Sequence, residues 1–220
     1  MARVGGRAML DTAIEAARGA GAERVLVVGG AEVRAHCAGS VDEVLDEAGE
    51  GRENIKKAMI AGNADQLLLM TSDLPFVNAD ALLAFLRAAT GSDVALPVAT
   101  GDAYVAAYPG APPHVTDLGG ERIVNGSVVY FAPGSAERVL PVAQRLFDAR
   151  KSLWKMASLL GPALLVRFAL RTLRIHHIEE RAREELDINA HACRNSSPSL
   201  CFDVDGDADY RYAQQHAVNG

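Results

Sequence analysis

The first residue that could do chemistry is Asp73, in the segment TSDLPF at positions 71–76. It follows the run Leu67–Met70, whose length and composition suit a buried strand. Open α/β sheets place their chemistry at the carboxyl ends of strands, and a carboxylate there can hold Mg²⁺ through oxygen. A turn, or a cap on the next helix, would also explain a single acid at this point. Asp73 is therefore a candidate Mg²⁺ ligand with a structural alternative.

A second acidic group, FDVDGD, lies at positions 202–207 near the end of the chain. We expect a strand over 200–204, and alternation along a strand would place Asp203 and Asp205 on one face. The alternatives are a solvated strand end, or acids that cap the last helix. A calcium-binding EF-hand loop is excluded, because the bidentate acid at its twelfth position is missing.

Two further segments could bind phosphate. Gly51 opens a helix expected over 53–61, and free backbone N–H groups at such a start can receive a phosphate or the edge of a base. An amphipathic helix with a solvated basic face is the alternative. Arg150 and Lys151 precede Trp154 and could hold a phosphate by charge, or could be surface residues around a buried tryptophan.

Composition narrows the class of protein. The formal net charge of −6 argues against a nucleic-acid-binding surface, which usually carries a basic stripe. Three cysteines without C-x-x-C spacing predict neither a disulfide framework nor a zinc site, and they suit the reducing cytoplasm. No stretch reaches the roughly 20 apolar residues that span a bilayer. We therefore expect a cytoplasmic protein that binds neither nucleic acid nor membrane.

The elements that must position these residues alternate between helix and strand. Hydrophobic periodicity predicts helices over 9–18, 41–47, 53–61 and 79–89, with strands over 24–28, 65–70 and 93–97. This alternation predicts a three-layer α/β/α fold with a mostly parallel, Rossmann-like central sheet. Further along the chain we expect strands over 103–108, 124–131 and 200–204, helices over 135–147, 153–173 and 175–186, and a short terminal helix. Residues 1–220 are expected to form one domain.

Five stretches, in this order, resemble the molybdenum-cofactor guanylyltransferase-like NTP transferase family, within the nucleotide-diphospho-sugar transferase fold. They are GGRAMLDTAIEAARGAGAERVLVVGG, GRENIKKAM before QLLLMTSDLPF, GERIVNGSVVYFAP, ARKSLWKMASLLG and FDVDGDADYRYA. The first is similar to the family's "G-x-P-M-L, helix, strand" opening, the third to its "G-x-x-x-G-N" strand, and the last to its "D-x-D-x-x-x-D" segment. The resemblance covers nearly the whole chain, and the order and spacing of the stretches are its specific part.

The resemblance implies a Mg²⁺-dependent transfer of a nucleotidyl group from an NTP, GTP or CTP, to a phosphorylated small-molecule acceptor, with release of pyrophosphate. Such chemistry depends on positioning and charge neutralisation. By position, the resemblance implies two metal ligands, two nucleotide-binding residues and two acceptor-binding residues: Asp73 and Asp205, Gly51 and Asn54, and Asn125 and Gly126. Asp203 is a less favoured metal ligand than Asp205. Arg150 and Lys151 are the basic candidates for a catalytic role.

One part of the family pattern has no counterpart here. The family opens with a strand and a loop, L-A-G-G-x-G-x-R…K, that cradles the triphosphate, and the resemblance begins after that loop. We therefore expect the first strand to be missing, which would leave the strands at 24–28 and 65–70 without a shared partner. Homodimerisation is one way to close such a gap. The sequence leaves open an active nucleotidyltransferase and a non-catalytic nucleotide-binding or interaction module; a glycosyltransferase is less favoured, because its D-x-D should end a mid-chain strand.

Overall fold

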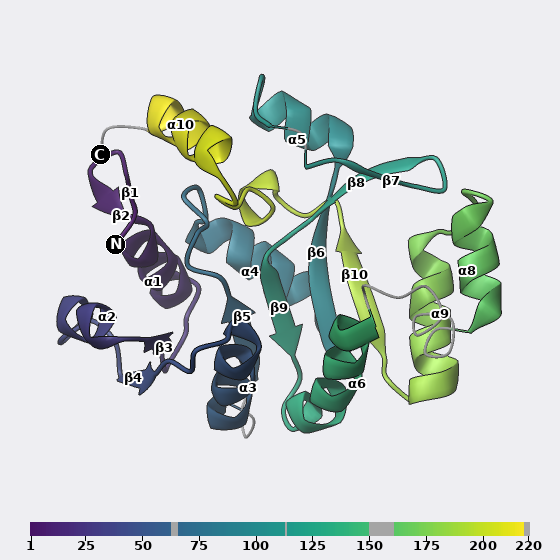
Figure 1. Cartoon of the computed structure of the whole chain (residues 1–220), viewed down its shortest axis with the longest axis horizontal. Helices are drawn as coiled ribbons and strands as arrows, with labels where there is room; N and C mark the ends of the chain where they lie inside the picture. Colours follow the sequence, from purple (N-terminus) through teal and green to yellow (C-terminus); the bar gives the residue numbers. More distant parts are fainter. Residues whose placement is uncertain (63–65, 113, 150–160, 218–220) are drawn as a thin grey trace.

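The computed structural model describes residues 1–62, 66–112, 114–149 and 161–217 (Figure 1). The strands are β1 (Arg3–Val4), β2 (Arg7–Ala8), β3 (Leu26–Gly29), β4 (Glu43–Asp46), β5 (Leu67–Met70), β6 (Val94–Thr100), β7 (Thr116–Leu118), β8 (Glu121–Asn125), β9 (Val128–Phe131) and β10 (Ala190–Arg194). The helices are α1 (Met9–Gly19), α2 (Ala31–His36), α3 (Gly51–Gly62), α4 (Ala79–Ala88), α5 (Gly101–Ala107), α6 (Ser135–Ala149), α8 (Pro162–Ala169), α9 (Ile175–Leu186), the 3₁₀ helix η1 (Pro198–Leu200) and α10 (Asp207–His216).

The main sheet has six strands in the order β5-β9-β6-β8-β7, with β10 paired to β6. β9 runs antiparallel to β5 and to β6, while β10 runs parallel to β6. It follows that β5, β6 and β10 all run in one direction and end at the same edge of the sheet. The expected α/β fold is confirmed, but the sheet is much less parallel than expected. The reason is that β8 and β9 pair antiparallel with their neighbours, and strand periodicity does not reveal the direction of a partner.

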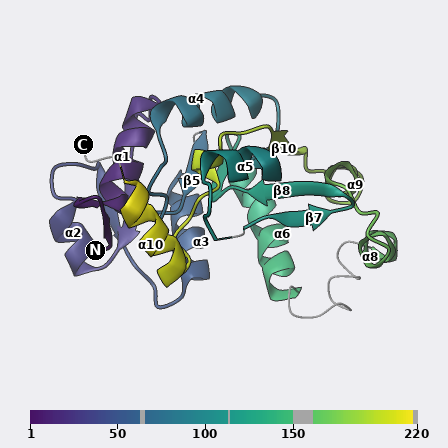
Figure 2. The same ribbon diagram turned by 90° about the horizontal axis from the view of Figure 1, so that it is seen from above.

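Helices cover both faces of the sheet, which makes the three layers that the sequence predicts. α1 packs against α4, and α3 packs against α6. Figure 2 shows α1 and α4 on one side of the strands and α3 and α6 on the other. The larger core includes Leu74, Leu82, Phe85 and Val128, and a second core on the side of α3 and α6 includes Met59 and Phe131. These two apolar cores hold the helices against the sheet and so fix the positions of the strand ends.

β3 and β4 form a separate parallel pair. In the described part of the chain, β3 pairs with β4 and β5 pairs with β9, so no strand is shared between β3 and β5. Helices make the connection instead. α3 contacts both β3 and β5, and α1 packs on Val25 and Val27 through Leu10 and Ile14.

Three predicted elements are wrong in kind, and the single strand expected over 124–131 is the end of β8 and the whole of β9, separated by Gly126 and Ser127. The helix expected over 41–47 is strand β4, because its β-branched and aliphatic residues pair with β3. The strand expected over 103–108 is helix α5, which begins where the backbone N–H of Ala103 donates to Oγ1 of Thr100 at 3.1 Å. The strand expected over 200–204 is the end of η1 followed by an extended segment without strand pairing.

Other boundaries agree closely with the sequence. α9 begins and ends at the predicted residues, and α4 begins after Asn78, whose Oδ1 accepts from the backbone N–H of Ala81 at 2.9 Å. The helix expected over 153–173 is described only from α8 onward; positions 150–160 lie outside the described residues. The single domain over 1–220 stays a prediction.

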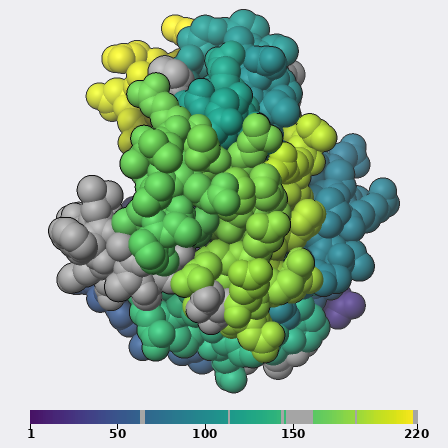
Figure 3. Space-filling model, turned by 90° about the vertical axis from the view of Figure 1, so that its right-hand side faces the viewer, coloured from purple at the N-terminus to yellow at the C-terminus, as the bar shows by residue number. Residues whose placement is uncertain are grey.

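The described helices and the cysteines also bear on which kinds of protein function suit this chain. No described helix is both long and apolar enough to cross a membrane. All three cysteines are buried and free, and burial raises the pKa of Cys201 to about 12, which suits a packing role better than a nucleophilic one. α8 and α9 form much of the face in Figure 3. Phe168 of α8 and Leu170, the residue after it, are exposed. The homodimer stays a prediction.

The buried phenol of Tyr104 gives a test of the core around α5. Its hydroxyl has no hydrogen-bond partner among the described residues, and burial raises its pKa above the ordinary value. Tyr104→Phe removes an unsatisfied polar group, so we expect an unchanged or higher melting temperature. Tyr212→Phe is the control: it removes a hydroxyl that donates to the carbonyl oxygen of Pro109 at 3.3 Å, and should cost about 1 kcal/mol in urea unfolding. A larger loss for Tyr104→Phe than for Tyr212→Phe would contradict this account.

Candidate functional site

Carboxylates and one imidazole gather beyond the carboxyl end of β5. Ligand atoms of His114, Asp203 and Asp205 all lie within 4.8 Å of one another. Asp73 follows β5, and its carbonyl oxygen accepts a hydrogen bond from the backbone N–H of Val204 at 3.0 Å. The structure thus brings Asp73 beside the segment of the second acidic pair, although the two are far apart in the sequence.

Neighbouring elements hold two members of this group, Asp203 and His114. The hydroxyl of Ser127, between β8 and β9, donates to Oδ2 of Asp203 at 2.6 Å. Nε2 of His114 lies 3.0 Å from Oδ1 of Asp209, in the first turn of α10. The other oxygen of Asp209 accepts from the backbone N–H of Gly206 at 3.0 Å. Figure 1 shows α5 and α10 at the upper end of the sheet, where these segments meet.

The electrostatics of the cluster favour a bound cation. The charge of Asp203, burial and the charge of Asp73, in that order, raise the pKa of Asp205, while His114 opposes this rise. Oδ1 of Asp73 is buried and has no hydrogen-bond partner among the described residues. A buried carboxylate oxygen without a donor is costly, and a divalent ion would relieve both this cost and the repulsion. The oxygen donors fit Mg²⁺.

A cluster of aromatic rings packs around Phe202, next to the acidic cluster. The ring of Phe202 is fully buried and lies 5.0 Å from the rings of Phe76 and Tyr108, centroid to centroid. Tyr212 of α10 adds a further contact at 5.5 Å. Because Asp203 follows Phe202 directly, the packed ring limits where that carboxylate can point.

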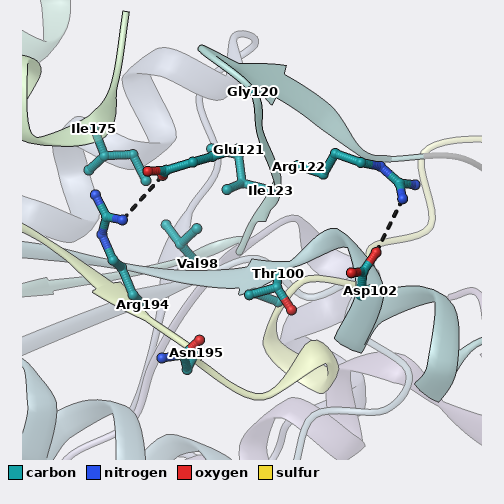
Figure 4. A pocket seen from close by; sticks show the side chains of 11 residues that line it. Val98, Thr100, Asp102, Gly120, Glu121, Arg122, Ile123, Ile175, Arg194 and Asn195 are labelled. Atoms are coloured by element: carbon teal, nitrogen blue, oxygen red, sulfur yellow. Dashed lines mark hydrogen bonds and ion pairs between the residues drawn. The ribbon is translucent and has the colours of Figure 1, made fainter.

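A pocket of about 450 Å³ opens at the same edge of the sheet. It is lined by the ends of β6 and β10 and by β8, and Val98 on its wall pairs with Asn125. Figure 4 shows two ion pairs beside it, Arg122 with Asp102 at 3.2 Å and Arg194 with Glu121 at 3.1 Å. Exposed pairs of this kind add little stability, so their guanidinium groups are available to an anionic ligand.

The nucleotide candidates lie on α3. Gly51 is its first residue, is exposed, and a Cβ atom there would meet no atom within 4 Å. Oδ1 of Asn54 accepts from the backbone N–H of Ala48 at 2.6 Å, so this side chain holds the turn before the helix. α3 precedes β5 and packs on it, which places the start of the helix at the same edge as Asp73. Their role in binding a base stays a prediction.

The acceptor candidates differ from each other. Asn125 is exposed at the end of β8. Gly126 is tightly packed: a Cβ atom there would come within 2.5 Å of the carbonyl oxygen of Leu200 and of Cγ of Pro97. The close approach of the backbone at Gly126 to η1 and Pro97 therefore explains why this residue is a glycine, without a role in ligand binding. Arg150 and Lys151 lie outside the described residues.

Sequence reasoning missed three members of the site: His114, Asp209 and Ser127. His114 lies in a Gly/Pro-rich stretch with no partner at metal-ligand spacing, and Asp209 lies 95 positions away in what reads as a helix cap. Only the packing of α10 beside α5 brings them together. The one local hint was the number of acids after Phe202.

In open α/β sheets, ligands bind at the edge where the parallel strands end, and the carboxylates of this chain gather at that edge. The comparison with family models makes this specific: the MobA-like NTP transferase domain matches residues 1–183. The chain belongs to this family of nucleotidyltransferase-like proteins. A search of curated proteins gave no significant match.

Solved structures agree on the fold. A hypothetical transferase from Thermus thermophilus is 24% identical, with a TM-score of 0.80 over 93% of this chain and 87% of that one. A CMP:2-keto-3-deoxy-manno-octonic acid synthetase complexed with CTP is 13% identical, with a TM-score of 0.55 over 88% and 81%. The 2-C-methyl-D-erythritol 4-phosphate cytidylyltransferase of Thermus thermophilus is 16% identical, with a TM-score of 0.53 over 97% and 90%.

The two candidate glycines should respond differently to alanine. Gly126→Ala forces a Cβ atom against Leu200 and Pro97, so we expect a loss of about 1–3 kcal/mol in unfolding free energy. Gly51→Ala meets open space and should leave stability unchanged or slightly raised. Urea unfolding of both variants checks this. Equal stability of the two would show that the crossing at Gly126 is looser than described.

The raised pKa of Asp205 predicts a pH-dependent stability. A carboxyl whose pKa is higher in the folded state favours folding below its ordinary value of 3.8, and this contribution is lost as pH rises through the folded value. In metal-free buffer, Asp205→Asn should therefore raise the melting temperature at neutral pH, and the gain should vanish in acid. Asp207→Asn is the control, because its charge lies at the start of α10 and favours the helix. A gain that persists below the ordinary pKa would contradict the like-charge explanation.

Proposed function

We propose that this chain transfers a nucleotidyl group from an NTP, GTP or CTP, to a phosphorylated small molecule, with Mg²⁺ as cofactor and pyrophosphate as product. The observation that supports this best is the group of Asp203, Asp205 and His114 at the edge where β5 ends. The backbone of Asp73 is hydrogen-bonded to Val204 of this segment, and one buried oxygen of its carboxylate lacks a partner among the described residues. Family membership supports the nucleotidyltransferase-like chemistry, while the metal, base and acceptor are our proposal.

In this proposal, an acceptor phosphate oxygen attacks the α-phosphorus, and the bond from that phosphorus to the bridging oxygen breaks as pyrophosphate leaves. A Mg²⁺ ion bound at the carboxylates would neutralise phosphate charge and orient the groups in line. Asp73 and Asp205 would hold the ion, and the Ser127 hydroxyl keeps Asp203 turned toward the same point. The first backbone N–H groups of α3, at Gly51 and Arg52, would receive the base or a phosphate.

The pocket beside β8 is the natural place for the acceptor. It lies at the edge where β6 and β10 end, next to Asn125 in the strand register. Arg122 and Arg194 would exchange their exposed carboxylate partners for the acceptor's phosphate, which a planar guanidinium binds through two hydrogen bonds. A small phosphorylated molecule suits a volume of about 450 Å³.

A nucleotide-binding module without catalysis is a second candidate, and one observation favours it. In the described part of the chain, β3 and β5 are joined by helices and not by a strand ladder. The sheet is therefore interrupted beside α3, the helix that carries the nucleotide candidates Gly51 and Asn54. Calorimetric titration of GTP and of CTP, run beside an assay for pyrophosphate, separates the candidates. Binding with no turnover would favour the module.

The transferase proposal makes a direct prediction for Asp73. Asp73→Asn keeps the size of the side chain but removes a ligand charge, so any NTP-dependent pyrophosphate release should fall by about 100-fold or more. Asp80→Asn is the control, because Asp80 lies in the first turn of α4, outside the acidic cluster, and should leave the rate unchanged. The assay compares GTP and CTP with phosphorylated acceptors, with and without Mg²⁺. Full activity of Asp73→Asn would remove Asp73 from the mechanism.

A further inference from the structure

We infer that His114 is a nitrogen ligand of the cation site, and that the site therefore binds a first-row transition ion such as Mn²⁺ in preference to Mg²⁺. This inference rests on the metal site of the proposed function and goes further by assigning a residue and an ion preference. In the part of the chain that the structure describes, no second group of three metal-ligating side chains shares this spacing.

The geometry places the imidazole among the carboxylates. One ring nitrogen of His114 and one oxygen each of Asp203 and Asp205 lie within 4.8 Å of one another, a spacing that small side-chain rotations close around one ion. The side chain of His114 is 19% exposed, so it is held by packing, and its ring lies 6.2 Å from that of Phe202. The same aromatic cluster thus positions both the imidazole and Asp203.

Asp209 supplies a second, independent observation. Its side chain is only 7% exposed, yet it carries a carboxylate 3.0 Å from Nε2 of His114. Histidines that bind metals usually donate their other N–H to a carboxylate, which fixes the ring and makes the ligating nitrogen more basic. Asp209 is itself fixed by the backbone N–H of Gly206. A buried acid paired with an imidazole that also lies close to two further acids is the set of groups expected around a metal-binding histidine.

The unpartnered oxygen of Asp73 points to the same conclusion. It is buried without a hydrogen-bond donor among the described residues, and the carbonyl oxygen of Asp73 accepts from the backbone N–H of Val204, which lies between Asp203 and Asp205. An imidazolium paired with Asp209 would neutralise one acid and leave this oxygen unsatisfied. A cation held by His114, Asp203 and Asp205 would offset the negative charge of the whole group, Asp73 included.

The mixed ligand set decides the ion. Mg²⁺ takes oxygen ligands and seldom nitrogen, whereas imidazole suits Mn²⁺, Co²⁺ and Zn²⁺ progressively better. Carboxylates alone would discriminate little between Mg²⁺ and Mn²⁺. The imidazole of His114 is therefore the group that sets the preference for a transition ion.

The test measures metal binding by the full chain, without nucleotide. Mn²⁺ and Mg²⁺ affinities come from calorimetry, and pulsed electron paramagnetic resonance of bound Mn²⁺ reports nitrogen hyperfine coupling. We expect a nitrogen coupling in the wild type that His114→Gln abolishes, with Mn²⁺ affinity falling at least about tenfold and Mg²⁺ affinity changing much less. Asp209→Asn should keep the coupling but weaken Mn²⁺ binding.

His36→Gln is the matched control. His36 lies in α2, and its Nε2 is 2.6 Å from Oδ1 of Asp11, so the variant removes a comparable His–Asp pair outside the acidic cluster. It should leave the coupling and the affinities unchanged. Melting curves confirm that each variant is folded, and Asp209→Asn tests the same ligand if His114→Gln does not fold.

The outcomes separate the inference from the proposed function. Bound Mn²⁺ without nitrogen coupling in the wild type, or an unchanged ratio of Mn²⁺ to Mg²⁺ affinity in His114→Gln, would overturn the inference. If Asp205→Asn then still abolished metal binding, the carboxylate site of the proposed function would stand alone. A coupling lost in His114→Gln, in a protein that releases no pyrophosphate from GTP or CTP, would support the inference while the transferase proposal failed.

Discussion

The buried ring of Phe202 is the contact on which the acidic edge of the molecule depends. Four other segments meet it: the loop after β5 through Phe76, helix α5 and its C-cap through Tyr104 and Tyr108, the segment before β7 through His114, and helix α10 through Tyr212. Like charges repel, so carboxylates from distant segments approach one another only where apolar packing holds their backbones. Aromatic pairs of this kind contribute beyond their buried area and have defined geometry, which makes them suited to that task.

Apolar packing therefore holds the carboxylates close together although their negative charges repel. The core forces Asp203 and Asp205 together, with Asp73 beside them, and the resulting repulsion appears as the raised pKa of Asp205. A chain selected for stability alone would place neutral residues here. A ligand that binds only the folded state stabilises that state. The stabilisation grows with the logarithm of the ratio of ligand concentration to dissociation constant. The acidic edge makes physical sense as a preorganised cation site, in which repulsion in the free protein becomes binding energy.

The sequence predicts best those features that local physics decides. β5, the Asn78 cap and the whole of α9 follow from periodicity and capping within one segment. Residues 103–108 show the limit: Tyr104 and Val105 favour a strand, but the cap at Thr100 and the packing against Phe202 make a helix. The site divides in the same way. Asp73 is readable because a strand precedes it, whereas the contact of His114 with Asp209 depends on two elements that only the tertiary fold brings together.

The break between β3 and β5 separates the six-stranded sheet from the β3–β4 pair, and the candidate sites are distributed unequally between these two parts. The acidic edge and the arginine-lined pocket belong to the six-stranded sheet, whose ladder from β5 to β10 is continuous. The β3–β4 pair is attached through α1 and α3, and helix packing without a shared ladder is a weaker connection than a run of backbone hydrogen bonds. α3, which carries Gly51 and Asn54, contacts both parts. Metal binding thus depends on the more firmly built part of the fold, and recognition of a nucleotide base would couple that part to the β3–β4 pair through one helix.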